Sequence, residues 1–148
     1  MRDGQMDKRY LLLVQGQWPK GKRHVKLKLQ RYVTGAGERR VNVDEEGRES
    51  HTIFDLERAC GAYSLLQAQL KTGRTHQIHV HLAHLGFPIV GDDKYGDFEL
   101  NKRLAKQGMK RMFLHAWKLA FVHPASGDPL ELEAPLPREL EKFMAALK

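Results

Sequence analysis

Four histidines lie within nine positions of the segment GRTHQIHVHLAHLG, residues 73–86: His76, His79, His81 and His84. Imidazole side chains can bind metals, transfer protons or pair with anions. The apolar residues Ile78, Leu82 and Leu85 recur at helical spacing, which predicts a helix. At about 100° per residue the histidines spread over more than half of its circumference, whereas a helical zinc pair needs i, i+4 spacing. The pattern disfavours a metal site and leaves two alternatives: capping or core histidines bonded to backbone, or histidines that face the phosphate groups of a ligand.

A second group of polar side chains follows in VGDDKYGD, which contains Asp92, Asp93 and Asp97. Clustered carboxylates can bind a hard cation, but such a loop needs more regularly spaced oxygen ligands. Glycine and aspartate at this density are typical of a turn. We therefore interpret the segment as a turn after an apolar stretch rather than as a metal site.

Composition and charge narrow the choice of partner. The 148 residues fit one domain, and 25 basic against 18 acidic side chains give a net charge of +7. This charge favours a polyanion, with nucleic acid preferred over a membrane surface. The single cysteine, Cys60, excludes an intrachain disulfide and suits a reducing cytoplasm. The sequence contains no P-loop, G-x-S-x-G or G-x-G-x-x-G motif and no apolar run of membrane-spanning length.

The remaining pattern predicts an α+β fold with a mixed, mainly antiparallel sheet and flanking helices. We expect strands at residues 9–16, 25–32, 39–43, 51–58, 62–70 and 113–124, with a short one within 128–137. The histidine-rich helix should begin at Thr75 as N-cap and end at Gly86. Further helices are expected at 98–108 and 137–148, with Pro137 near the first helical position of the second.

A basic RNA-binding face is predicted from strand alternation. In VKLKLQRY, Val25, Leu27 and Leu29 point one way, and Lys26 and Lys28 point the other. A helix N-terminus also favours anions. The predicted RNA-binding residues are Lys26, Lys28, Arg31, Arg39, Arg40, Arg74, Thr75, His76 and Gln77. The alternative for the strand lysines is simple solvation.

Four ordered stretches resemble the large-ribosomal-subunit pseudouridine synthases of the RluA, RluC and RluD type. They are residues 7–18 (DKRYLLLVQGQW), 47–57 (GRESHTIFDLE), 71–97 (KTGRTHQIHVHLAHLGFPIVGDDKYGD) and 111–137 (RMFLHAWKLAFVHPASGDPLELEAPLP). The insert GDFELNKRL is most similar to the RluC subgroup. The resemblance covers the chain from about residue 7 to residue 148.

This resemblance implies an enzyme that isomerises uridine in 23S ribosomal RNA without a metal or cofactor. Tyr10 matches the tyrosine that stacks on the target base, and residues 74–77 match GRTHQ at the mouth of the cleft. The family's catalytic aspartate lies in H-R-L-D-x-x-T-S-G and pairs with a basic residue, which falls on His79 here. A carboxylate in such a cleft needs a cation beside it to stay ionised, and a histidine supplies one only when protonated.

The motif H-R-L-D does not occur in these 148 residues. We therefore expect residues 1–148 to be the C-terminal part of a pseudouridine synthase catalytic domain. The nucleophile and an S4-type RNA-binding domain would then lie upstream of Met1, and the chain would be inactive alone. The alternative is a non-catalytic RNA-binding module on the same scaffold. Both hypotheses predict a monomeric, cytoplasmic protein that binds ribosomal RNA and no membrane.

Overall fold

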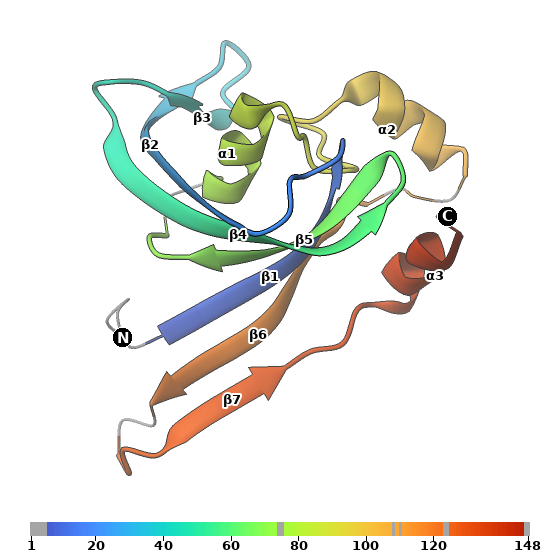
Figure 1. The fold of residues 1–148 in the computed structure, drawn as a ribbon. Coiled ribbons are helices and arrows are strands. Elements are labelled where there is room, and N and C mark those ends of the chain that lie inside the picture. The colour runs from blue at the N-terminus through green and yellow to red at the C-terminus, as the bar shows by residue number, and fades with distance from the viewer. Residues whose placement is uncertain (1–5, 74–75, 108, 110, 123–124, 147–148) are drawn as a thin grey trace.

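The computed structural model describes residues 6–73, 76–107, 109, 111–122 and 125–146. Seven strands form one sheet in the order β3-β2-β4-β5-β1-β6-β7, and every pairing between these strands is antiparallel (Figure 1). The strands are β1 (Met6–Gln15), β2 (Lys22–Val33), β3 (Arg39–Val43), β4 (Arg48–Cys60), β5 (Tyr63–Leu70), β6 (Leu114–Val122) and β7 (Pro129–Glu133). The helices are α1 (Gln77–Leu85), α2 (Phe98–Ala105) and α3 (Arg138–Ala146). The α+β prediction with a mainly antiparallel sheet is confirmed.

Apolar side chains cover both faces of the middle of the sheet. On one face, called here the α1 face, Leu12, Phe54 and Leu66 pack with Ile78 and Leu82 of α1. Figure 1 shows α1 lying over the part of the sheet formed by β2, β3 and β4, and α1 contacts each of these strands. Val25 of β2 belongs to the same apolar cluster, which accounts for the apolar side of this alternating strand.

The opposite face is covered by the other two helices. Leu11, Leu13 and Leu65 pack with Leu100 of α2 and Leu140 of α3. Since β1 is buried on both faces, its sequence is a continuous apolar run rather than an alternating one. Among the described residues, no helix is long and apolar enough to span a membrane.

The start of α1 differs from the prediction, and its end agrees with it. The N-cap residue is His76, with φ 51° and no capping hydrogen bond from its side chain. Thr75, the expected cap, lies outside the described residues. Gly86 ends the helix in the left-handed conformation, with φ 87°, as a C′ glycine should.

The other helices begin close to the predicted positions. The Asp97 carboxylate accepts a hydrogen bond from the backbone N–H of Leu100 and caps α2. This helix ends at Ala105, three residues before the predicted end at 108. Pro137 directly precedes α3, and its carbonyl accepts from the backbone N–H groups of Leu140 and Glu141.

Candidate functional site

Tyr10 lies on the central strand β1 and on the α1 face. It pairs with Ala68 of β5 and Ala116 of β6, beside a register shift between Arg9 and Tyr10. Its half-buried ring packs against the apolar cluster that contains Ile78 of α1. The sheet therefore places the predicted stacking tyrosine on the face that also carries the histidine-rich helix.

His79, the predicted partner of a carboxylate, already has one within this chain. Its Nδ1 lies 2.9 Å from Oδ2 of Asp92, and the Asp92 side chain is only 2% exposed. Burial raises the pKa of Asp92, but hydrogen bonds from His79 and from the backbone N–H groups of Lys94 and Tyr95 outweigh it, so the pKa is lowered. The buried carboxylate thus remains ionised, and the Nδ1 of His79 must donate the hydrogen bond.

The turn after α1 is built around Asp92. Its Oδ1 accepts from the backbone N–H groups of Lys94 and Tyr95, and its backbone carbonyl accepts from the side-chain amide of Asn101. The Asn101 carbonyl in turn accepts from the backbone N–H of Gly91. These contacts agree with the interpretation of VGDDKYGD as a turn. In the part of the chain that the structure describes, no three histidine, cysteine or acidic side chains are grouped to hold a metal ion.

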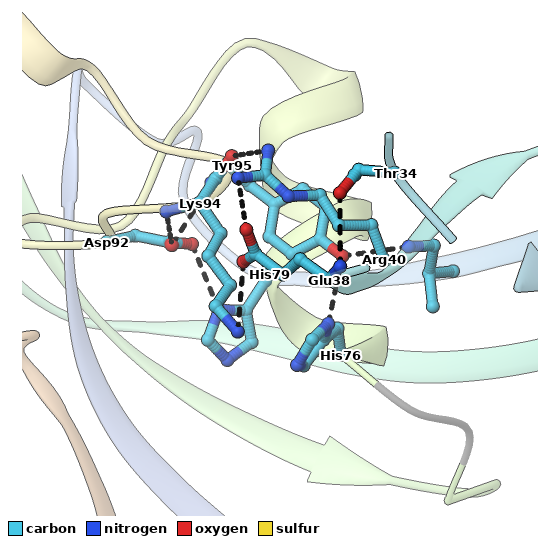
Figure 2. A network of polar contacts seen from close by, with 9 residues as sticks. Thr34, Glu38, Arg40, His76, His79, Asp92, Lys94 and Tyr95 are labelled. Carbon is cyan, nitrogen blue, oxygen red and sulfur yellow. Dashed lines mark hydrogen bonds and ion pairs between the residues drawn. The ribbon is translucent and has the colours of Figure 1, made fainter. Parts of the chain in front are cut away.

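His76 joins the same network through Tyr95 (Figure 2). The Tyr95 hydroxyl accepts from the backbone N–H of Val41 at 2.8 Å and lies 2.9 Å from the Nδ1 of His76. The hydroxyl can donate its own proton to a neutral His76 while its oxygen accepts from Val41. Burial, followed by the charges of His79 and Lys94, lowers the pKa of His76. The neutral imidazole is therefore favoured at this position.

Arg40 is held by the same cluster. Its guanidinium donates to the backbone carbonyl of Lys94 and to the carboxylate of Glu38, and the ammonium of Lys94 lies 3.2 Å from Glu38. Hydrogen bonds from Arg40 and Lys94 lower the pKa of Glu38. Figure 2 shows these three side chains next to His76 and His79. Arg40 is thus held by hydrogen bonds at the edge of the site and is not an isolated cation.

Gln77 lies inside the protein, contrary to its predicted role at an RNA surface. Its side-chain amide donates to the carbonyl of His51 and to the hydroxyl of Thr52, and its carbonyl accepts from the hydroxyl of Thr72. The residue is 3% exposed. It ties the start of α1 to β4 and to the end of β5.

Replacing Gln77 with alanine is expected to destabilise the chain by about 2 kcal/mol, because buried groups of Thr52 and His51 lose their donor. Urea unfolding measures the change. The matched control is Gln107→Ala, at an exposed residue after α2, which should cost less than about 0.5 kcal/mol. Equal effects of the two substitutions would show that the Gln77 hydrogen bonds contribute nothing.

His81 is a core histidine, one of the two alternatives left open for the cluster. It is 0% exposed, and its Nε2 lies 2.7 Å from the hydroxyl oxygen of Ser50. That hydroxyl donates to the carbonyl of Leu27, so the Nε2–H of His81 must donate to it. Burial, with smaller contributions from His51 and His84, lowers the pKa of His81 to about 4. The ring is therefore neutral near pH 7.

The predicted basic residues do not share one face. Lys26 and Lys28 pair with His51 and Glu49 on the face opposite α1, where the four residues help to line an open groove of about 400 Å³. Strand alternation places Arg31 and its partner Val41 on the α1 face instead, together with Arg39. Arg74 and Thr75 lie outside the described residues. The prediction of a single basic face is wrong for Arg31 and Arg39.

Asp92 was missed as a partner of His79 in the sequence analysis. The two residues are 13 positions apart, and a turn rich in glycine and aspartate gives no sign of which carboxylate faces the helix. Asp92 is buried, whereas its neighbour Asp93 is exposed. The available signal was the apolar pair Ile89 and Val90, three and two positions before Asp92; both are buried, in two different clusters of the core.

Comparison with known proteins finds a family model and relatives that are all named as pseudouridine or pseudouridylate synthases. A family model described as RNA pseudouridylate synthase matches residues 1–84. The ribosomal large subunit pseudouridine synthase C of Pasteurella multocida is 41% identical over 148 residues, which is all of this chain and 45% of that protein. The protein of the same name from Escherichia coli K12 is 40% identical, over all of this chain and 47% of that protein. The chain thus spans about half the length of these curated relatives.

Solved structures agree with the fold. Human RNA pseudouridylate synthase domain containing 1 superposes with a TM-score of 0.73 and 27% identity, over 90% of this chain and 56% of that chain. Human RNA pseudouridylate synthase domain containing 4 gives a TM-score of 0.72 at 22% identity, over 97% of this chain and 64% of that chain. The second similarity is one of fold alone.

Proposed function

Because the chain belongs to the RNA pseudouridylate synthase family, we propose that it forms part of an enzyme that converts uridine to pseudouridine in 23S ribosomal RNA. The family match over residues 1–84 is the observation that carries this proposal. The position of Tyr10 and α1 on one face of the sheet supports it, because this arrangement allows both to contact one extruded nucleotide. The relevant compartment is the cytoplasm, and the chain acts as a monomer.

In the proposed reaction, Tyr10 stacks on the uracil after the target nucleotide has left its helix. The bond from N1 of the base to C1′ of the ribose breaks, the base turns, and C5 forms the new bond to C1′; C5 then loses its proton and N1 gains one, so that the product is an isomer of uridine. His79, when protonated, pairs with the carboxylate that acts on the sugar and keeps it ionised. No aspartate of this chain lies in an H-R-L-D motif, so we propose that this carboxylate comes from residues outside the 148. The reaction as proposed uses no metal or cofactor.

A chimera tests this proposal directly. It joins the part of the Pasteurella multocida relative that this chain does not match to the 148 residues, in the order of that relative. We expect the chimera to form pseudouridine in a 23S transcript, measured by carbodiimide labelling and primer extension. The control carries asparagine in place of the H-R-L-D aspartate and should form none. A folded chimera that binds the transcript without isomerising it would overturn the enzyme proposal.

The alternative, a non-catalytic RNA-binding module, is favoured by one observation, the absence of the H-R-L-D motif from these residues. The same experiment separates the two. If the chain binds the transcript and the folded chimera never isomerises it, the alternative holds. If the chain by itself forms pseudouridine, one of its own aspartates is the nucleophile. The proposal of a carboxylate from outside the 148 residues and the non-catalytic alternative are then both wrong.

The groove at Lys26 and Lys28 is proposed to hold the RNA backbone. Both side chains are exposed, and the ring nitrogens of His51 and His24 lie 2.9 Å apart beside them. Burial, followed by the charges of Lys26, His24 and Lys71, lowers the pKa of His51. An excess of positive charge around the groove disfavours another proton on His51 and favours a phosphate.

The double substitution Lys26→Gln, Lys28→Gln is expected to weaken binding of a single-stranded 23S fragment. Each phosphate contact contributes about 0.7 to the slope of log K against log salt, so two lost contacts should reduce the slope by about 1.4. Binding is measured by fluorescence anisotropy across a salt series. The control replaces Lys102 and Lys106, two exposed lysines in and after α2. The groove assignment fails if both double variants change the slope equally.

A further inference from the structure

The hydrogen bonds of Asp92 fix which nitrogen of His79 carries a proton. Oδ1 of Asp92 is occupied by the backbone N–H groups of Lys94 and Tyr95, and Oδ2 faces the Nδ1 of His79. An ionised carboxylate can only accept hydrogen bonds. Nδ1 therefore carries its proton in both the neutral and the protonated ring, and Nε2 is the one nitrogen left for another partner.

Among the described charged groups near the His79 ring, Asp92 is the one in direct contact with it. From α1, the ring of His76 lies with its centroid 5.5 Å from that of His79, and from the turn the Tyr95 ring lies at 6.0 Å. The nearby cations Lys94 and Arg40 are both paired with Glu38. Within the described part of the chain, Asp92 is the carboxylate in ion-pair contact with His79.

We propose that Asp92 is a positioning residue, which holds His79 with Nδ1–H in the turn and so allows the ring to become an imidazolium that donates from Nε2–H to an anionic group. The identity of that group, the carboxylate that acts on the sugar, rests on the proposed function. The tautomer assignment does not rest on it. A buried carboxylate behind a histidine sets the tautomer and orientation of the ring and stabilises its charged form.

Substitution of Asp92 by asparagine reverses this arrangement. The asparagine carbonyl is required by the two backbone donors from Lys94 and Tyr95, which leaves its NH₂ group facing Nδ1 of His79. An NH₂ group donates, so Nδ1 must then accept and the proton moves to Nε2. In that state the ring cannot become an imidazolium without losing its hydrogen bond to residue 92.

Long-range proton–nitrogen NMR of the histidine rings in the 148-residue chain tests the proposal. We expect His79 of the unchanged chain to carry its neutral-form proton on Nδ1, and His79 of Asp92→Asn to carry it on Nε2. The matched control, Asp93→Asn, removes the exposed neighbouring carboxylate and should leave Nδ1–H in place. His79→Gln assigns the signals.

Two outcomes overturn the proposal. One is a proton on Nε2 of His79 in the unchanged chain, a result that does not depend on the folding of Asp92→Asn. The other is retention of Nδ1–H in folded Asp92→Asn. Neither depends on RNA, whereas the proposed function fails separately, through a folded chimera that forms no pseudouridine.

Discussion

Replacing Gly91 with alanine is expected to destabilise the chain by about 3 kcal/mol or more. Gly91 has φ +84°, and a Cβ added there would overlap the backbone carbonyl oxygen of Arg111. The first feature strains any side-chain-bearing residue, and the second forces two backbone segments apart. Because Gly91 directly precedes Asp92, the displacement should also break the hydrogen bond to His79. Urea unfolding gives the loss of stability.

Gly37→Ala is the matched control for this substitution. Gly37 has the same φ of +84°, but nothing lies within 4 Å of an added Cβ. Its cost should therefore be the conformational one alone, about 1 kcal/mol. If both variants lose the same stability, the close approach of Gly91 to Arg111 has no energetic weight, and the turn is not held as described.

Stability is expected to fall by about 3 kcal/mol between pH 7 and pH 4 because of His81 alone. The pKa of His81 is about 4 in the folded chain, against an ordinary histidine value of 6.5. Between these values the unfolded chain binds the proton and the folded chain does not, so protonation favours unfolding. Stability is therefore full above pH 6.5 and declines as the pH falls towards 4. The slope contributed by one such group approaches about 1.4 kcal/mol per pH unit.

Urea unfolding over this pH range, with His81→Gln for comparison, measures the effect. Glutamine has an amide that can donate to Ser50 and does not titrate, so its unfolding free energy should decline less steeply. The lowered pKa values of His51 and His76 act in the same direction and are present in both proteins. Identical pH slopes for the two proteins would rule out His81 as the source.

Much of the sheet could be predicted from local patterns. The apolar run of β1 and the alternation of β2 indicated a strand buried on both faces and a strand with one polar side. The end of α1 at Gly86 also followed from local chemistry, since a left-handed residue there favours glycine. These features depend on neighbours within a few positions, which the sequence displays directly.

The start of α1 and the positions of Gln77 and Arg31 differ from the prediction for different reasons. The side chain of the N-cap residue His76 contacts the Tyr95 hydroxyl, 19 residues away, and Gln77 is buried against partners on β4. Such contacts between distant segments leave no local pattern. The position of Arg31 could have been predicted, because the alternation that puts Lys26 and Lys28 on one face of the strand puts residue 31 on the other face.

The site itself was identified mainly by resemblance. Tyr10 in a strand and His79 on a helix are ordinary in spacing and type, and only the ordered motifs around them indicated a shared role. The burial of Asp92 rather than Asp93 could not be predicted from residue type, since the two side chains are chemically identical and differ in burial. Ile89 and Val90, both buried in the core, indicated a buried segment before Asp92 but not which of the two aspartates turns inward.

NMR titration of the labelled chain with a short uridine-containing fragment of 23S RNA tests the central claim, that Tyr10 and the start of α1 receive one nucleotide together. The account predicts that ring signals of Tyr10 and His79 move in parallel at the same RNA concentrations. Lys118 and Glu131, which line a separate groove with Asp7 and Arg9, should stay unchanged. Movement at Lys118 and Glu131 with none at Tyr10 and His79 would contradict it.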